Sequence, residues 1–295
     1  MKFGLTLLPE GSSWDQVLSV AKAADEMDTF DSVWSGDHFI ATGGDDLNAG
    51  RFEAWTLLTA VAQATRRVRV GVLVSAMVNR HPAVTANMAA TLDAVSNGRF
   101  ELGLGAGWKE EEFSPYGIEL GTVKERFDRF EEGLEVIDSL LTNEYTTFSG
   151  KYYQLTEARC EPKPIQKPRV PFVMGGSGEK RTLPLVARFA DHWNFPPVHR
   201  AGPGGARLPQ TIPHLSLDSL NQAKDVLAAE CQKIGRDPRD ILISTTVRAR
   251  DGLGVLAEQA EMFHGAGVDR LIIAPVGHNP DDLEAIAKTV DPFLD

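Results

Sequence analysis

Short apolar runs alternate with longer segments of helical periodicity along most of the chain. Ser13 with Gln16, and later Thr122 with Glu125, have the spacing of a capping box, and apolar residues follow each pair at helical intervals. A His-Pro pair at 81–82 places proline at a first helical position. We therefore expect helices to begin at these points, and further helices over 52–64, 179–189, 216–234, 254–264 and from residue 281.

The apolar runs between these helices have the length and composition of strands. Strict alternation of strand and helix over 295 residues predicts a parallel sheet, and this many units close naturally into a (β/α)8 TIM barrel. We expect one domain spanning 1–295, with a small hairpin around Ser149-Gly150 and a Gly/Pro-rich loop at about 196–215. A doubly wound open sheet is the alternative. The expected strands are 3–8, 32–35, 67–74, 99–105, 172–176, 192–195, 241–247 and 268–275.

Composition and charge narrow the range of partners. The net charge of −11 disfavours nucleic acid and anionic membrane surfaces, because both require clustered cations. No run approaches the ~18 apolar residues of a membrane span. The apolar stretch in the opening "MKFGLTLLPEGSSW" is too short for a secretory signal, because Pro and Glu interrupt it. Cys160 and Cys231 do not have the spacing of a metal site or of a disulfide framework. We expect a cytoplasmic protein with a small-molecule substrate.

In a barrel of this kind the active face lies at the C-terminal ends of the strands. Asp37 and His38 follow the second expected strand, 74–80 the third and "GLGAGWKEEE" the fourth. "GGSGEKR" follows the fifth strand. The irregular segments 41–50, 106–121 and 196–215 also follow strands, so we expect them to form the walls of a pocket on the same face.

The turn "GGSGEKR", residues 175–181, is a candidate anion site. A strand, several glycines and a helix N-terminus together expose backbone N–H groups that favour an anion. Ser177 adds a hydroxyl donor, and Lys180 or Arg181 adds positive charge. Its spacing is not that of a Walker A loop. The alternative is a glycine turn that serves only to accommodate positive φ.

Several other polar residues are candidates for chemistry. His38 beside Asp37 is the best candidate for proton transfer, with a capping aspartate and a half-buried histidine as the alternative. Glu112 is the one pocket candidate in its acidic run. "GLGAGW" does not have the dinucleotide-binding spacing, and it indicates backbone that approaches another group closely. The histidines at 192, 199 and 214 lack the spacing of a zinc site, so we expect no metal.

Longer stretches carry a family resemblance. "SVWSGDHF", "FEAWTLLTAVAQATRRVRVGVLV", "NRHPAVTANMAATLDAVSNGRFELGLGAGW", "ERFDRFEEGLEVI", "FSGKYYQL" and "GGSGEKRTLPLVARFADHWN" resemble the luciferase-like monooxygenase superfamily, most closely its branch that uses the deazaflavin coenzyme F420. The resemblance covers nearly the whole chain in order. It implies a (β/α)8 barrel, often a homodimer, with F420 or FMN bound at the C-terminal mouth of the strands.

The resemblance also implies roles for individual residues. It implies a non-prolyl cis peptide at Leu73–Val74 behind the coenzyme ring, and it places the coenzyme phosphate on the glycine turn. Trp108 stands where some deazaflavin dehydrogenases carry a glutamate, which disfavours a sugar-phosphate dehydrogenase. His192 stands where relatives have glycine and is a candidate to face the substrate. The implied coenzyme site comprises Asp37, His38, Leu73, Val74, Ser75, Gly105, Gly107, Trp108, Glu112, Gly175, Gly176, Ser177, Gly178 and Lys180.

These observations lead to a functional hypothesis with two alternatives. The first is an F420-dependent oxidoreductase that transfers a hydride to or from a small organic substrate, with His38 moving the proton and Asp37 orienting it. The alternatives are an FMN-dependent monooxygenase and a non-catalytic flavin-binding protein. The deazaflavin carries an oligoglutamate tail, for which Arg51, Lys109 and Arg181 are candidate partners.

Overall fold

A computed structural model describes residues 1–42, 48–197 and 216–294. Within these ranges the main sheet has nine parallel strands, and the β3–β5 pairing closes it into a barrel. The order around the barrel is β3-β2-β1-β11-β10-β9-β8-β5, and β4 (Ser75–Ala76) continues β3 beyond a break. The strands are β1 (Lys2–Thr6), β2 (Phe30–Ser35), β3 (Arg69–Val72), β5 (Phe100–Gly105), β8 (Phe172–Gly175), β9 (His192–Phe195), β10 (Leu242–Arg248) and β11 (Arg270–Ala274).

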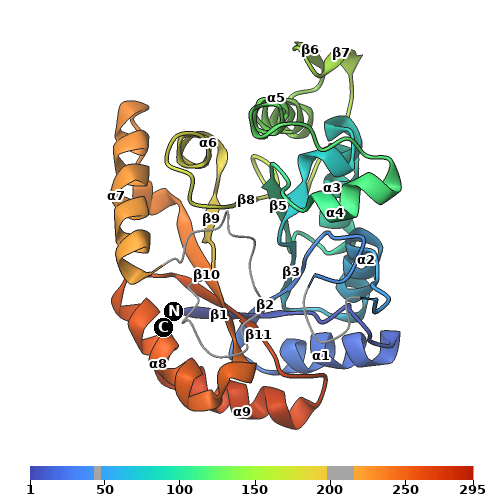
Figure 1. Ribbon diagram of the computed structural model, residues 1–295. Helices are drawn as coiled ribbons and strands as arrows, with labels where there is room; N and C mark the ends of the chain where they lie inside the picture. Colours follow the sequence, from blue (N-terminus) through green and yellow to red (C-terminus); the bar gives the residue numbers. More distant parts are fainter. Residues whose placement is uncertain (43–47, 198–215, 295) are drawn as a thin grey trace.

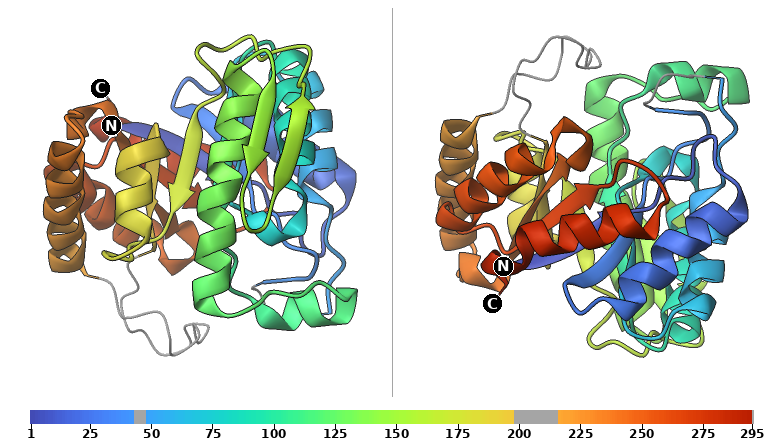
Figure 2. Two further views of the ribbon diagram at one scale, coloured as in Figure 1. Left: turned by 90° about the horizontal axis from the view of Figure 1, so that it is seen from above. Right: turned by 90° about the horizontal axis from the view of Figure 1, so that it is seen from below.

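Helices surround the barrel on its outside, and the two chain ends lie together (Figures 1 and 2). The expected capping boxes at Ser13 and Thr122 are both present. The N-terminal ammonium donates to Phe293 O at 2.9 Å. The helices are α1 (Trp14–Glu26), α2 (Ala54–Ala64), α3 (Pro82–Val95), α4 (Glu110–Phe113), α5 (Val123–Thr142), α6 (Thr182–Phe189), α7 (Leu217–Lys233), α8 (Leu253–Gly265) and α9 (Pro280–Val290).

The sequence predictions of strands and most helices are confirmed, including the hairpin β6 (Thr146–Ser149) and β7 (Gln154–Ala158). The helix expected over 179–189 begins instead at Thr182; residues 179–181 form a turn, across which Gly178 O accepts from the N–H groups of Thr182 and Leu183. The short helix α4 was not predicted. From residue 198, the expected loop at 196–215 lies outside the described residues. None of the helices in the described ranges has the length and hydropathy needed to cross a bilayer.

The apolar residues of the barrel form two separate cores. The larger core lies between the strands and the surrounding helices, and the smaller one fills the barrel interior with Trp34, Val173 and Ile272. The Trp34 indole needs the space of two glycines: a Cβ on Gly71 would lie 2.8 Å from Trp34 Cη2, and one on Gly4 would lie 2.9 Å from Trp34 Nε1. The indole therefore separates the N-terminal floor of the barrel from its C-terminal mouth.

A buried charged network closes the N-terminal floor. Arg270 binds Glu101 at 3.1 Å and Asp31 at 2.8 Å, and His192 Nδ1 lies 3.1 Å from Glu101. Burial alone would raise the pKa of Glu101, but Arg270, with His192 and Arg69, holds that pKa well below its usual value. Burial lowers the pKa of His192. The expectation that His192 faces the substrate is wrong, because as the first residue of β9 it lies at the opposite end of the barrel from the mouth.

Candidate functional site

The C-terminal ends of β2, β3, β5 and β8 meet around Val74. The non-prolyl cis peptide expected at Leu73–Val74 is present, between β3 and β4. A Cβ on Gly105 would lie 2.9 Å from Val74 Cγ2, and one on Gly175 would lie 3.6 Å from Val74 Cγ1. On the other side, a Cβ on Gly36 would lie 3.5 Å from Leu73 O and 3.4 Å from His38 Cδ2. The expected ring-contacting residues and the glycine turn are therefore on one face.

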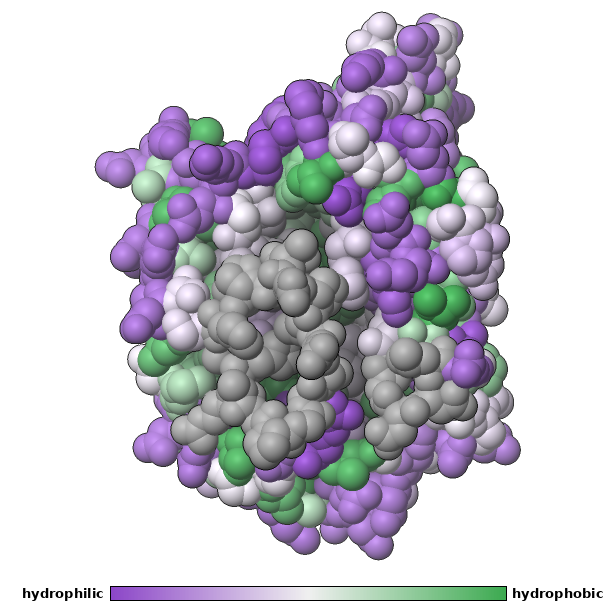
Figure 3. Space-filling view, viewed as in Figure 1, coloured by the Kyte–Doolittle hydropathy of each residue, from purple (hydrophilic) through white to green (hydrophobic). Residues whose placement is uncertain are grey.

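That face is the one seen in Figure 1, and Figure 3 shows the same view in space-filling form. Hydrophilic residues dominate its rim. The irregular segment 106–121 lies on this side, as the sequence predicts, whereas residues 43–47 of the expected segment 41–50 lie outside the described residues. Small residues at the strand ends, such as Gly105 and Gly175, keep the mouth open because they have no side chain to fill it.

The turn at 175–178, called here the glycine elbow, has the features of an anion site. Gly176 has φ +114°, a conformation that favours glycine, and its carbonyl accepts from Trp193 Nε1 at 2.7 Å. Gly176 N–H donates to Asn194 O at 3.2 Å, which fixes the elbow against β9. Within the described residues, the N–H groups of 177–180 donate to no protein acceptor. Ser177 is half-buried and residues 178–180 are exposed, so these N–H groups are open to solvent and available to a ligand anion.

Of the two cations expected beside the elbow, only Lys180 is available. Arg181 Nη2 binds Asp128 Oδ1 at 3.0 Å and lies 3.6 Å from Glu131, so its charge is already balanced. Lys180 is exposed and has no ion pair with any residue that the structure describes. An ammonium near a phosphate acts as a point charge on a flexible stem. Lys180 therefore fits the role expected of it, and Arg181 does not.

His38 is held by Glu112 and not by Asp37. His38 Nδ1 lies 2.9 Å and 3.0 Å from the two carboxylate oxygens of Glu112, which also accepts from Phe39 N–H. The Glu112 side chain is 2 % exposed and the His38 side chain 20 %. A carboxylate at Nδ1 fixes the proton on that nitrogen and leaves Nε2 open to exchange a proton. The expectation that Asp37 orients His38 is wrong, since Glu112 holds His38 Nδ1 and the Asp37 carboxylate is bound by Ser75 and Arg80.

Asp37 belongs to a different buried cluster. Its carboxylate accepts from Ser75 Oγ and Arg80, and more weakly from Trp55 Nε1 at 3.3 Å and Asn79 Nδ2 at 3.2 Å. Asp37 is 2 % exposed, so Arg80 supplies the charge that its burial requires. The cluster ties the loop after β2 to Ser75, the residue after Val74. Sequence reasoning missed Arg80 because the pairing spans 43 positions with no local pattern.

The remaining predicted residues are also located at the mouth. Trp108 is 47 % exposed, and its ring centroid lies 6.1 Å from that of His38. The carbonyl oxygen of Gly107 accepts a hydrogen bond from Arg126 Nη1 at 3.1 Å. Two of the cations considered for an oligoglutamate tail are already engaged: Arg51 binds Glu10 and Gly36 O, and Lys109 binds Ala41 O at 2.9 Å.

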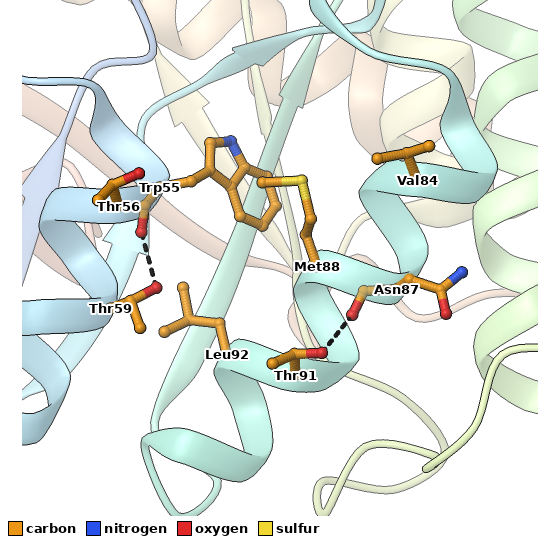
Figure 4. A pocket seen from close by; sticks show the side chains of 8 residues that line it. All are labelled: Trp55, Thr56, Thr59, Val84, Asn87, Met88, Thr91 and Leu92. Carbon is orange, nitrogen blue, oxygen red and sulfur yellow. Dashed lines mark hydrogen bonds between the residues drawn. The ribbon is translucent and has the colours of Figure 1, made fainter.

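A second concave surface lies on the outside of the barrel, between α2 and α3 (Figure 4). Its volume is about 320 Å³, and Val84 and Met88 line it along one wall. Trp55 contributes its indole to the opposite wall. This groove contains threonines, an asparagine and apolar side chains but no acid, base or nucleophile suited to catalysis. The chemistry-bearing residues are therefore at the mouth and not in this groove.

Comparison with known proteins identifies the family. The model of the luciferase-like monooxygenase family matches residues 1–208. The chain belongs to this family. A relative, the F420-dependent glucose-6-phosphate dehydrogenase of Amycolatopsis mediterranei, is 37 % identical over 161 residues, which is 54 % of this chain and 46 % of the relative. The pyrimidine monooxygenase RutA of Allorhizobium ampelinum is 32 % identical over 145 residues, 48 % of this chain and 38 % of the relative.

Two solved structures share the whole fold of this chain. An F420-dependent secondary alcohol dehydrogenase in complex with an F420-acetone adduct superposes with a TM-score of 0.81 at 21 % identity, over 100 % of this chain and 99 % of that one. The F420-dependent tetrahydromethanopterin reductase of Methanopyrus kandleri has a TM-score of 0.78 at 18 % identity, over 100 % and 99 %. These likenesses confirm the (β/α)8 barrel. The chain spans about half the length of the first curated relatives in its sequence matches.

Proposed function

We propose that this luciferase-like protein is a coenzyme F420-dependent oxidoreductase that transfers a hydride between the deazaflavin and a small organic substrate. The observation that carries the proposal is the convergence of three features on one barrel mouth. These are the open N–H groups of the glycine elbow, the Val74 backing between Gly105 and Gly175, and the His38–Glu112 pair. The F420-dependent relatives in both comparisons support the choice of coenzyme.

The residues at the mouth fit a flat ring with an anionic tail. A Cβ on Gly105 would intrude between the strand end and Val74, so the glycines leave a cradle that a side chain would fill. The elbow N–H groups, Ser177 Oγ and Lys180 would hold the phosphate, and Val74 would support the ring. When bound, the deazaflavin would supply two-electron hydride chemistry. Holding both reactants in near-attack geometry would lower the barrier by several kcal/mol.

His38 would move the proton that accompanies the hydride. With its Nδ1–H directed at Glu112, His38 can accept or donate a proton only at Nε2. Glu112 would stabilise the imidazolium form during oxidation of an alcohol and fix the ring plane in either direction. Trp108, exposed beside His38, would cover one side of the reacting atoms and limit the entry of water. Asp37 would act indirectly, by fixing the position of Ser75.

An FMN-dependent monooxygenase is the second candidate. The match to a pyrimidine monooxygenase at 32 % identity favours it, and the phosphate site at the elbow would suit either coenzyme. The third alternative, a non-catalytic flavin-binding protein, would give the His38–Glu112 pair no role. Homodimer formation, expected from the family resemblance, and a cytoplasmic location, expected from the sequence, accompany the first proposal.

The test is a titration of the purified chain with F420 and with FMN, followed by fluorescence quenching. We expect tighter binding of F420. Lys180→Gln should raise the dissociation constant about threefold to tenfold, the loss expected for one exposed charge-assisted contact. Lys22→Gln is the matched control, because Lys22 is exposed on α1 and its replacement by glutamine removes the same charge. Binding of FMN alone would favour the monooxygenase, and binding of neither coenzyme would refute both.

A further inference from the structure

The alternation of side chains along β10 directs Arg248 into the barrel mouth. Ser244 faces the interior, because its hydroxyl lies 2.6 Å from His192 Nε2 and 2.8 Å from Asn194 Nδ2. Val247 faces the helices and is part of the outer core. Since successive residues of a strand point to opposite faces, Arg248 shares the interior face with Ser244. It is the last residue of β10, so its side chain belongs to the mouth.

Arg248 lies across the barrel mouth from part of the coenzyme cradle. The cradle is formed by the ends of β3, β5 and β8; β10 lies across the barrel from β3, and β9 alone separates it from β8. Arg248 pairs in register with Ala274 of β11, and Leu5 of β1 pairs with Ile273. The neighbouring interior positions at this level are therefore Ala274 and Thr6, both small. A ligand resting on the cradle would have this wall on its open side.

Among the residues that the structure describes, Arg248 has no partner for its charge. It is half-buried, yet across residues 1–42, 48–197 and 216–294 it makes no hydrogen bond or ion pair through its side chain. The other arginines at the mouth are neutralised: Arg51 by Glu10 and Arg80 by Asp37. Burial lowers the pKa of Arg248, and the nearby Arg250 lowers it further, against a smaller opposing effect of Asp251. An approaching anion would relieve both costs.

We propose that Arg248 binds an anionic group, a carboxylate or a phosphate, on the substrate of this enzyme. The inference rests on the proposed function, because it takes the mouth as the place where substrate and coenzyme meet. A guanidinium presents a planar fork of donors that matches two oxygens of a carboxylate or phosphate. An anion at Arg248 would anchor the substrate on the wall facing the cradle, with its reacting carbon toward His38. The enzyme would therefore select organic anions over neutral molecules of similar shape.

The test measures binding of two probe anions, benzoate and phenyl phosphate, and of neutral benzyl alcohol. Ligand-observed NMR titrations of the full chain are made with and without F420. The variants are Arg248→Gln and Arg250→Gln, which remove the same charge from positions two residues apart. Arg250 is exposed and serves as the matched control. Both variants should keep the thermal unfolding midpoint of the unmodified protein, since neither side chain has an ion-pair partner among the described residues.

We expect at least one anion to bind more tightly than benzyl alcohol, and Arg248→Gln to weaken that binding about tenfold to hundredfold. Arg250→Gln should change it less than threefold. The proposal is overturned if no anion is preferred, if the two variants weaken binding equally, or if Arg248→Gln weakens F420 binding while anion binding is unchanged. Failure of the chain to bind F420 would refute the proposed function instead, and titrations without coenzyme would still decide the role of Arg248.

Discussion

Replacement of Glu101 by glutamine would test how far the barrel depends on the charged network of its floor. The Glu101 side chain is 5 % exposed, and it faces Arg270, whose own side chain is 3 % exposed. Glutamine keeps the shape of the side chain but removes the charge that balances a guanidinium in the barrel interior. His192 and Arg69 would lose the same partner.

The expected cost follows from what remains around Arg270. Removing one partner of a buried ion pair costs about 3–5 kcal/mol, because the other charge stays buried and unpaired. Here Asp31 still binds Arg270, so we expect the lower end, about 3 kcal/mol. For 295 residues at ~2.1 cal/mol/K per residue, the entropy of unfolding is about 0.6 kcal/mol/K. The unfolding midpoint should therefore fall by about 5 °C.

Differential scanning calorimetry at pH 7 measures this shift. Glu135→Gln is the matched control, because Glu135 binds Arg188 at 2.7 Å, the Arg188 side chain is 50 % exposed, and the substitution is chemically identical. Exposed pairs of this kind contribute about 0.2–1 kcal/mol, so the control should shift the midpoint by less than about 2 °C. Equal shifts for the two variants would refute the reasoning, since burial would then have no influence on the value of the pair.

Three further results are expected. Gly71→Ala should destabilise the protein by about 1–3 kcal/mol in urea unfolding, because the new Cβ overlaps the Trp34 indole. The control, Gly254→Ala, lies in open space on α8 and should stabilise the protein slightly. Similar effects of the two substitutions would contradict the packing of the interior. The folded-state pKa of His192 is lowered, so the unfolded chain binds more protons at this residue and stability should fall as the pH drops below ~6.5. The urea midpoint should therefore depend less on pH in His192→Asn. An unchanged dependence of the midpoint on pH would exclude His192 as the cause. His38→Ala should reduce hydride transfer about hundredfold in stopped-flow measurements and leave F420 affinity within tenfold; unchanged turnover would remove His38 from the mechanism.

Much of the fold and the membership of the site could be predicted from sequence, because both have local signals. Each barrel strand is a short apolar run, and capping boxes at Ser13 and Thr122 mark two helix starts. The position of a residue after a strand indicates that it belongs to the mouth of a parallel barrel. That rule located His38 and the glycine elbow without any coordinate, and the resemblance added the cis peptide before Val74.

Only the tertiary structure decided which of these residues interact. His38 is bound by Glu112, 74 positions away, and not by the adjacent Asp37, because side-chain direction and strand closure determine contacts that spacing along the chain does not encode. The same closure balanced the charge of Arg181 and buried His192 on the floor, whereas Lys180 has no ion pair within the described part of the chain. Arg248 illustrates the difference most clearly: the sequence shows one arginine among many, whereas strand order and register place it at the mouth, across the barrel from β3 and without an ion pair among the described residues.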